Sequence, residues 1–106
     1  RRRTELLEEI ETALAEYDVI ITTAMLTPQP PLDDKAPFPF LDVPMIAVPF
    51  NLTLHPVQTI RAGFFDDGMP IGAQIVGRNW DEATVLKVAH SFEKNAGQLK
   101  RYPDLK

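Results

Sequence analysis

Apolar residues with helical spacing predict a first helix over residues 1–17. One face of this segment carries Leu6, Leu7, Ile10, Ala13, Leu14 and Tyr17. This pattern is typical of a helix that buries one side against a core, although it can also dock a partner. Thr4 is expected to be the N-cap, and Glu5 suits the first turn, where a negative side chain is favourable.

A second long helix is predicted over residues 81–96 by the same spacing. Its apolar face consists of Val85, Val88, Ala89, Phe92 and Ala96. Asp81 can cap the N-terminus of this helix, and Gly97 can close its C-terminus.

Residues 18–25 predict a strand between the two helices. Most of this segment is the run Val19-Ile20-Ile21-Thr22-Thr23-Ala24-Met25, which is rich in β-branched side chains and lacks polar alternation. This composition indicates a strand that is buried on both faces.

The next segment is rich in proline: seven of the ten prolines fall between Pro28 and Pro49. Proline can neither continue a helix nor donate to a strand ladder. We therefore expect a loop over residues 26–49, either a rigid extended connection or the wall of a pocket. A polyproline ligand at Pro28-Gln29-Pro30-Pro31 is a further alternative.

Residues 50–78 are expected to hold a short helix and a hairpin. The helix can form between Met45 and Leu54. The hairpin joins strands at residues 57–65 and 71–77, because Asp66-Asp67-Gly68 supplies the positive φ that its turn needs. Glycines in or beside the second strand, Gly72 and Gly77, suggest a close backbone approach or a bulge.

This element order predicts a mixed α/β fold, with helices packed on a small mixed sheet. The 106 residues are sufficient for a single small domain over residues 1–106.

Composition and charge exclude several kinds of function. A net charge of −4 gives no electrostatic reason to bind nucleic acid. No apolar run is long enough to span a membrane, and the N-terminus has no secretory h-region, so we expect a cytoplasmic protein. The chain has no cysteine and no adjacent glycines. This excludes a disulfide framework, a thiolate zinc site and the glycine-rich nucleotide loops, and we expect no cofactor.

The sequence shows no catalytic constellation. Ser91 is the only serine, and its neighbour His90 points in a direction about 100° away if both lie on a helix, so the two do not form a dyad. His55 is isolated in sequence from any carboxylate, and two histidines without i,i+4 spacing do not make a metal site. We therefore predict neither catalytic residues nor metal ligands.

Three stretches resemble the C-terminal portion of the amidase signature family. They are Tyr17-Asp18-Val19-Ile20-Ile21-Thr22, Pro49-Phe50-Asn51-Leu52-Thr53-Leu54-His55-Pro56, and Ala62-Gly63-Phe64-Phe65-Asp66-Asp67-Gly68-Met69-Pro70-Ile71-Gly72-Ala73-Gln74-Ile75-Val76-Gly77-Arg78 with the following Asp81-Glu82-Ala83-Thr84. Family members commonly read Y-D-V-L-L-T-P-T, P-F-N-x-T-G-x-P and D-G-x-P-x-G-x-Q-I-V-G-R in this order, then D-E-A-T. Coverage extends from about Arg1 to about Ala96.

The resemblance implies an amidase that hydrolyses a C–N amide bond of a small molecule. The family uses a Ser–cis-Ser–Lys triad, which cannot be placed on a chain with one serine and no Gly-Gly. We therefore expect the C-terminal part of an amidase that is not catalytic alone, whose partner is the missing N-terminal catalytic part. A non-catalytic interaction or scaffold domain is the alternative, and a component of an amidotransferase is a third possibility within the family.

The resemblance also suggests where an acyl pocket lies. By position, its neighbours are Thr22, Thr23, Pro44, Val48 and Asn51. Three departures from the family pattern are Thr23 and Arg61 in place of prolines and Leu54 in place of glycine. The last matters most, because a left-handed backbone at that position disfavours leucine.

If the chain is cut from a larger sheet, the strand edges and apolar faces that the rest of the protein covers are left exposed. We therefore expect the isolated chain to self-associate through the surface of residues 19–25.

Overall fold

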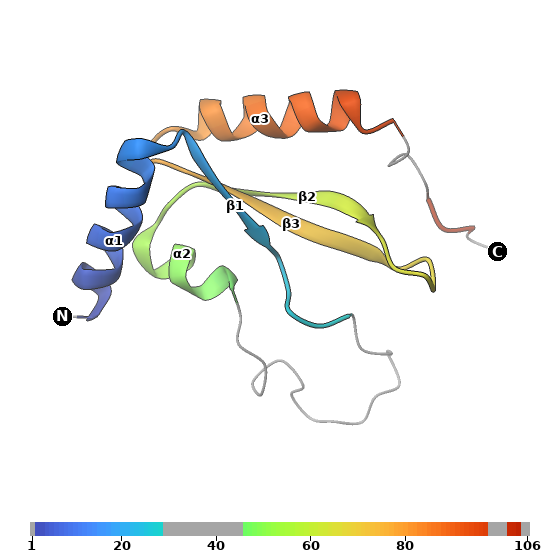
Figure 1. Cartoon of the computed structure of the whole chain (residues 1–106), viewed down its shortest axis with the longest axis horizontal. Coiled ribbons are helices and arrows are strands. Elements are labelled where there is room, and N and C mark those ends of the chain that lie inside the picture. The colour runs from blue at the N-terminus through green and yellow to red at the C-terminus, as the bar shows by residue number, and fades with distance from the viewer. Residues whose placement is uncertain (1, 29–45, 98–101, 105–106) are drawn as a thin grey trace.

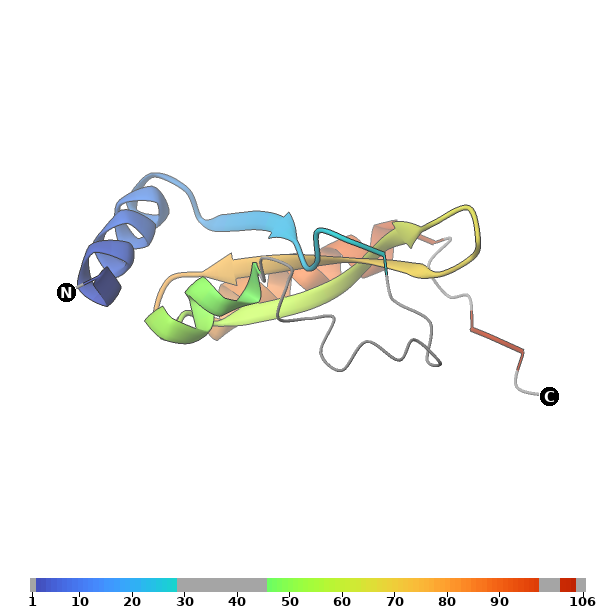
Figure 2. The same ribbon diagram turned by 90° about the horizontal axis from the view of Figure 1, so that it is seen from below.

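The computed structural model describes residues 2–28, 46–97 and 102–104. Its elements, in chain order, are α1 (Arg2–Glu16), β1 (Val19–Thr23), α2 (Ala47–Thr53), β2 (Val57–Phe64), β3 (Pro70–Gly77) and α3 (Glu82–Asn95). The strands form one antiparallel sheet in the order β1-β3-β2. α3 runs along one face of the sheet and α2 lies on the opposite side (Figures 1 and 2). The expected α/β class with helices on a small sheet is confirmed. Within the described residues both strand pairs are antiparallel, so the sheet there is not mixed as expected.

The central strand β3 separates two hydrophobic cores. Its side chains alternate between the faces of the sheet, so Ile75 and Val76 are both fully buried but belong to different clusters. Val76 packs with buried residues of the first two helices, Ile10, Leu14 and Phe50. Ile75 packs with Ile60, Val85 and Ala89. The chain is therefore a layered unit in which β3 is covered on both sides.

The helix ends differ in detail from the expectation. α1 begins at Arg2, so Thr4 lies inside the helix and is not its N-cap. Asp81 caps α3 as expected, its side chain accepting a hydrogen bond from the Thr84 N–H. Ala96 closes α3 with φ −92°, its N–H bonded to the Phe92 carbonyl, so no left-handed glycine is needed and Gly97 is not the cap.

The expectation that the first strand is buried on both faces is wrong. β1 forms one margin of the sheet, and Ile21 at its centre is 63% exposed. α3 packs on β2 and β3. On the α3 side of β1, Val19 therefore reaches the core beneath the helix, whereas Ile21 stays exposed. The sequence pattern indicated apolar character correctly, but burial depends on what lies beside the strand.

Residues 29–45, most of the expected proline-rich loop, lie outside the described residues. The end of that loop is corrected: residues 47–49 belong to α2, which falls within the window from Met45 to Leu54 that the sequence favoured.

The hairpin between β2 and β3 turns where the sequence placed it. Gly68 has φ 85°, and its N–H donates to the Phe65 carbonyl. The ladder irregularity lies between Arg61 and Gly63 on β2, not at the glycines of β3. Those glycines mark close approaches instead, since a Cβ at Gly72 would meet the Cβ of Ala24 at 3.0 Å.

Candidate functional site

The end of β1 is held by a buried glutamine on the neighbouring strand. Gln74 is almost fully buried, and its Nε2 donates a 3.0 Å hydrogen bond to the Thr23 carbonyl. The Thr23 hydroxyl donates to the Met25 carbonyl at 2.6 Å. A buried amide must be satisfied to be tolerated, so this pair of bonds fixes the backbone where the expected pocket wall begins.

The two threonines of the expected pocket face opposite sides of the sheet. Thr22 lies opposite Gln74 and is in phase with Ile20, which lies opposite Val76 in the core beneath α2. Thr22 therefore shares the α2 side of the sheet, whereas Thr23, opposite Ala73, is in phase with the α3 side.

α2 carries two further residues of the expected pocket. Val48 and Asn51 are both exposed on this helix. The structure thus brings Thr22, Val48 and Asn51 to the same side of the sheet, on two elements. Pro44 lies outside the described residues.

The C-terminus of α2 is closed by a leucine in a left-handed conformation. Leu54 has φ 61° and ψ 27°, and its N–H donates to the Phe50 carbonyl. Its side chain is 72% exposed, so no packing compensates for the backbone strain. The backbone here is the conformation for which the family pattern uses glycine. Leu54 and Trp80 are the non-glycine residues with positive φ within the described part of the chain.

A polar cluster after Leu54 joins three distant segments. The His55 side chain is fully buried, and its Nε2 donates to Glu11 Oε1 of α1 at 2.8 Å. Asn79 donates to the same oxygen at 3.1 Å. The other ring nitrogen, Nδ1, lies 2.7 Å from Thr53 Oγ1. Sequence reasoning missed this cluster, because Glu11 and His55 are 44 residues apart.

Arginine side chains complete the attachment of α1. Arg78 Nε donates to the Leu14 carbonyl at 2.7 Å and its NH2 to the Tyr17 carbonyl at 3.2 Å. Arg3 Nε donates to the Leu52 carbonyl of α2 at 2.7 Å. The carbonyls of Leu14 and Leu52 are among those that a helix leaves open at its C-terminus. The Arg3 bond fixes α1 beside α2.

A cavity of about 660 Å³ lies beyond the end of β1. It is lined by Ala24, Met25, Thr27, Thr59, Ile60, Arg61, Phe65, Pro70, Ile71, Gly72, Glu93, Ala96 and Tyr102. The Arg61 guanidinium lies 5.2 Å from the ring centre of Phe64 and 5.9 Å from that of Tyr102. Of the expected pocket residues that the structure describes, Thr22, Thr23, Val48 and Asn51, none lines this cavity, although Ala24 directly follows Thr23.

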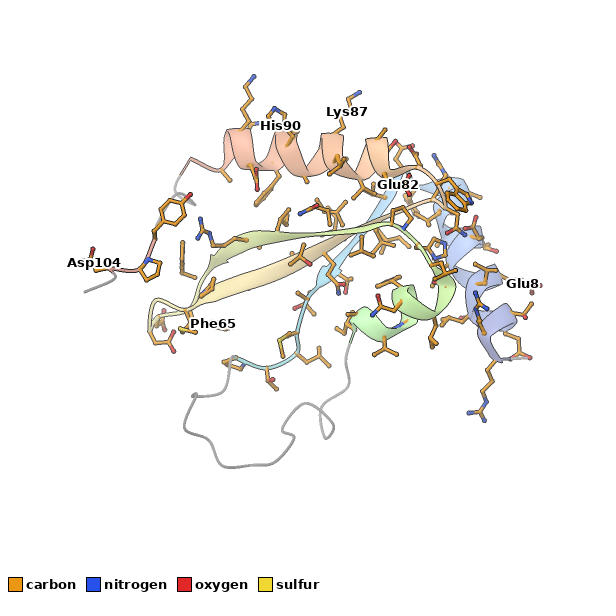
Figure 3. All side chains as sticks on the ribbon, turned by 180° about the vertical axis from the view of Figure 1, so that it is seen from behind. Glu8, Phe65, Glu82, Lys87, His90 and Asp104 are labelled. Atoms are coloured by element: carbon orange, nitrogen blue, oxygen red, sulfur yellow. The ribbon has the colours of Figure 1, made fainter. Side chains whose placement is uncertain are left out.

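The two residues of α3 that were considered as a dyad, His90 and Ser91, are both exposed. His90 points away from the sheet, on the outer side of the helix with Lys87 (Figure 3), and Ser91 is also exposed. Within residues 2–28, 46–97 and 102–104, no three His, Cys, Asp or Glu side chains gather closely enough to hold a metal ion. No helix in the described part of the chain is long and apolar enough to cross a membrane.

Comparison with known proteins identifies relatives over most of the chain. The profile of the family described as Amidase matches residues 1–86. The A subunit of glutamyl-tRNA(Gln) amidotransferase from Brevibacillus brevis is 38% identical over 107 residues, covering 96% of this chain and 21% of the relative. The protein of the same name from Geobacillus thermodenitrificans is 35% identical over 105 residues, covering 97% of this chain and 21% of the relative.

A solved structure shares the fold. The A subunit of glutamyl-tRNA(Gln) amidotransferase from Thermotoga maritima superposes with a TM-score of 0.75 and 28% identity, over 88% of this chain and 21% of that chain. The chain thus spans about a fifth of the length of the relatives that it matches.

Proposed function

The chain belongs to the Amidase family, and from this membership we propose that it is the C-terminal part of an enzyme that hydrolyses a C–N amide bond of a small molecule. The observation that carries the proposal is the family match over residues 1–86 in a chain that spans only 21% of its relative's length. The 106 residues hold one serine, so the Ser–cis-Ser–Lys triad that the family uses has to come from the missing N-terminal catalytic part.

Within such an enzyme, the role of this chain is to build one wall of the acyl pocket. The proposed wall consists of Thr22, Thr23, Pro44, Val48 and Asn51. In its support, Thr22 shares a side of the sheet with α2, and Gln74 holds the Thr23 carbonyl. The cluster around Glu11 fixes the C-terminal end of α2.

Two other functions remain as competing proposals. A component of an amidotransferase is favoured by the names of the relatives, which are A subunits of glutamyl-tRNA(Gln) amidotransferase at 35–38% identity. A non-catalytic interaction or scaffold domain is favoured by the exposed apolar residues, Ile21 among them. Under each of these functions we propose a cytoplasmic location. For the isolated chain we propose self-association through residues 19–25.

A chimera tests the amidase proposal. The segment of the Brevibacillus brevis relative that matches this chain is replaced by residues 1–106, and ammonia release is measured from glutamine and simple primary amides. We expect the chimera to release ammonia, and both the isolated chain and the relative without the segment to release none. Ser91→Ala in the chimera serves as a control, since this exposed serine has no catalytic role in the proposal.

Each result bears on a different proposal. A folded chimera that hydrolyses no amide contradicts the amidase proposal and favours the scaffold domain. Hydrolysis of glutamine but of no other amide favours the amidotransferase component. Sequencing upstream of Arg1 gives an independent check, because an amidase requires a lysine and a Gly-Gly-Ser-Ser stretch there.

A further inference from the structure

The C-terminal end of α2 has the geometry of a Schellman cap, but with uncommon residues at its two outer positions. The Leu54 N–H donates to the Phe50 carbonyl, and so does the His55 N–H, at 3.3 Å. Helices that end in this way commonly have glycine at the left-handed position and an apolar residue at the next one, which packs back onto the helix. Here a leucine takes the first position, and a histidine with a fully buried side chain takes the second.

The conformation of Leu54 needs support from its neighbours in the chain. A left-handed backbone is unfavourable for a residue with a Cβ, and the Leu54 side chain is too exposed for its own packing to offset the strain. Strained conformations persist where the surrounding structure holds the backbone in place. The hydrogen-bonded turn of α2 holds Leu54 on one side, so the support on the other side has to come from His55, which follows it directly.

The imidazole of His55 is anchored at both ring nitrogens. Its Nε2 donates to Glu11 Oε1 at 2.8 Å, and its Nδ1 lies 2.7 Å from Thr53 Oγ1. A buried polar ring is tolerated when its nitrogens are satisfied, and a turn of Leu54 to negative φ would carry the ring away from these partners. Glu11 is itself held by Asn79, whose amide donates to the same oxygen at 3.1 Å. The anchor therefore ties the residue after the strained turn to α1 and to the segment that follows β3.

We propose that Glu11 and His55 are positioning residues, which hold Leu54 left-handed and thereby orient the last turn of α2 in the acyl pocket. Asn51 lies in that turn, so the direction of its side-chain amide depends on how the turn ends. This second step rests on the proposed function, in which Asn51 belongs to the pocket wall. The anchor takes the place of the glycine in the family pattern, because glycine adopts a left-handed backbone without such support.

The backbone conformation of residue 54 gives the direct test. A positive φ brings the amide and α protons of one residue close together, so the nuclear Overhauser effect between them is strong. We expect a strong effect for Leu54 in the 106-residue chain and its loss in Glu11→Ala, because the turn relaxes without the anchor. Glu11→Gln keeps the acceptor oxygen and should keep the strong effect. Glu8→Ala, an exposed change on the same helix, is the matched control.

Thr53→Val is a milder change, which decides the question if Glu11→Ala loses its circular dichroism spectrum. It removes the hydroxyl that contacts Nδ1 of His55 but keeps the shape of the side chain, and we expect the same loss of the strong effect at Leu54. A strong effect at Leu54 in every variant that folds would overturn the inference, since the turn would then hold its conformation without the anchor.

Kinetics of the chimera test the link from the turn to the pocket. Glu11→Ala should raise the KM for the amide roughly two- to tenfold and leave kcat unchanged, since a displaced Asn51 loses about one hydrogen bond to the bound acyl group. Adding Leu54→Gly should restore KM, because glycine keeps the left-handed turn without the anchor. A merely structural role would instead lower the amount of active enzyme, and thus the apparent kcat, and would leave KM unmoved.

The outcomes separate this inference from the proposed function. A KM that stays unchanged in Glu11→Ala, or that Leu54→Gly does not restore, overturns the positioning of Asn51. A chimera that releases no ammonia contradicts the amidase proposal and with it the positioning of Asn51. The nuclear Overhauser effect of Leu54 in the 106-residue chain decides independently whether the anchor holds the turn.

Discussion

Relief of the strain at Leu54 is expected to stabilise the chain. A left-handed backbone costs a residue with a Cβ about 1–2 kcal/mol, and glycine adopts φ 61° freely. Glycine, however, lowers the free energy of unfolding by about 0.5–1 kcal/mol, because it gives the unfolded chain more conformational freedom. Leu54→Gly should therefore be more stable than Leu54→Ala by about 0.5–1 kcal/mol, since both variants lose the same exposed side chain.

The assay is urea unfolding of the two variants and the unmodified chain, followed by circular dichroism at one protein concentration. A difference of this size corresponds to roughly 2–8 °C in Tm for a domain of 60–100 residues. The alanine variant is the control, because it removes the leucine without relieving the strain. Equal stability of the glycine and alanine variants would refute the argument, since it would mean that the left-handed conformation carries no cost.

Two further substitutions test the packing around the candidate site. Glu11→Ala leaves the buried imidazole of His55 without its acceptor, so we expect a loss of about 1–3 kcal/mol in urea unfolding, whereas Glu8→Ala on the exposed side of α1 (Figure 3) should change little. A similar loss in both variants would contradict the role of the cluster. Gly77→Ala drives a methyl group into the Val85 side chain and should cost about 1–3 kcal/mol, while Gly97→Ala meets nothing within 4 Å. Thermal unfolding of these two variants checks this, and equal Tm values would argue against the close approach.

Local signals explain which parts of the fold could be predicted. The hairpin turn and the start of α3 depend on Gly68 and Asp81, whose partners lie within four residues. The left-handed backbone at Leu54 was also predictable, because the amidase pattern has glycine there. In these cases the chemistry that determines the backbone lies in a short stretch of sequence.

Long-range contacts explain what could not be predicted. The Gln74 bond to the Thr23 carbonyl joins residues 51 apart, and the Asn79 bond to Glu11 joins residues 68 apart. The exposure of Ile21 depends on which strands and helices lie beside β1, and a run of apolar residues carries no such information. The expected pocket was likewise defined by a family pattern, and the structure divides its described members between β1 and α2.

The placement of β1 beside β3 has a consequence for how the chain folds. The hairpin of β2 and β3 and the helix α3 follow one another directly, so their contacts close short loops. α1 and β1 join them only through partners about half the chain away, such as the Arg78 bond to the Leu14 carbonyl across 64 residues. Loop closure costs more entropy as loops lengthen. We therefore expect residues 57–95 to form the folding nucleus, with φ-values well above those of α1, and the N-terminal helix and strand to dock last.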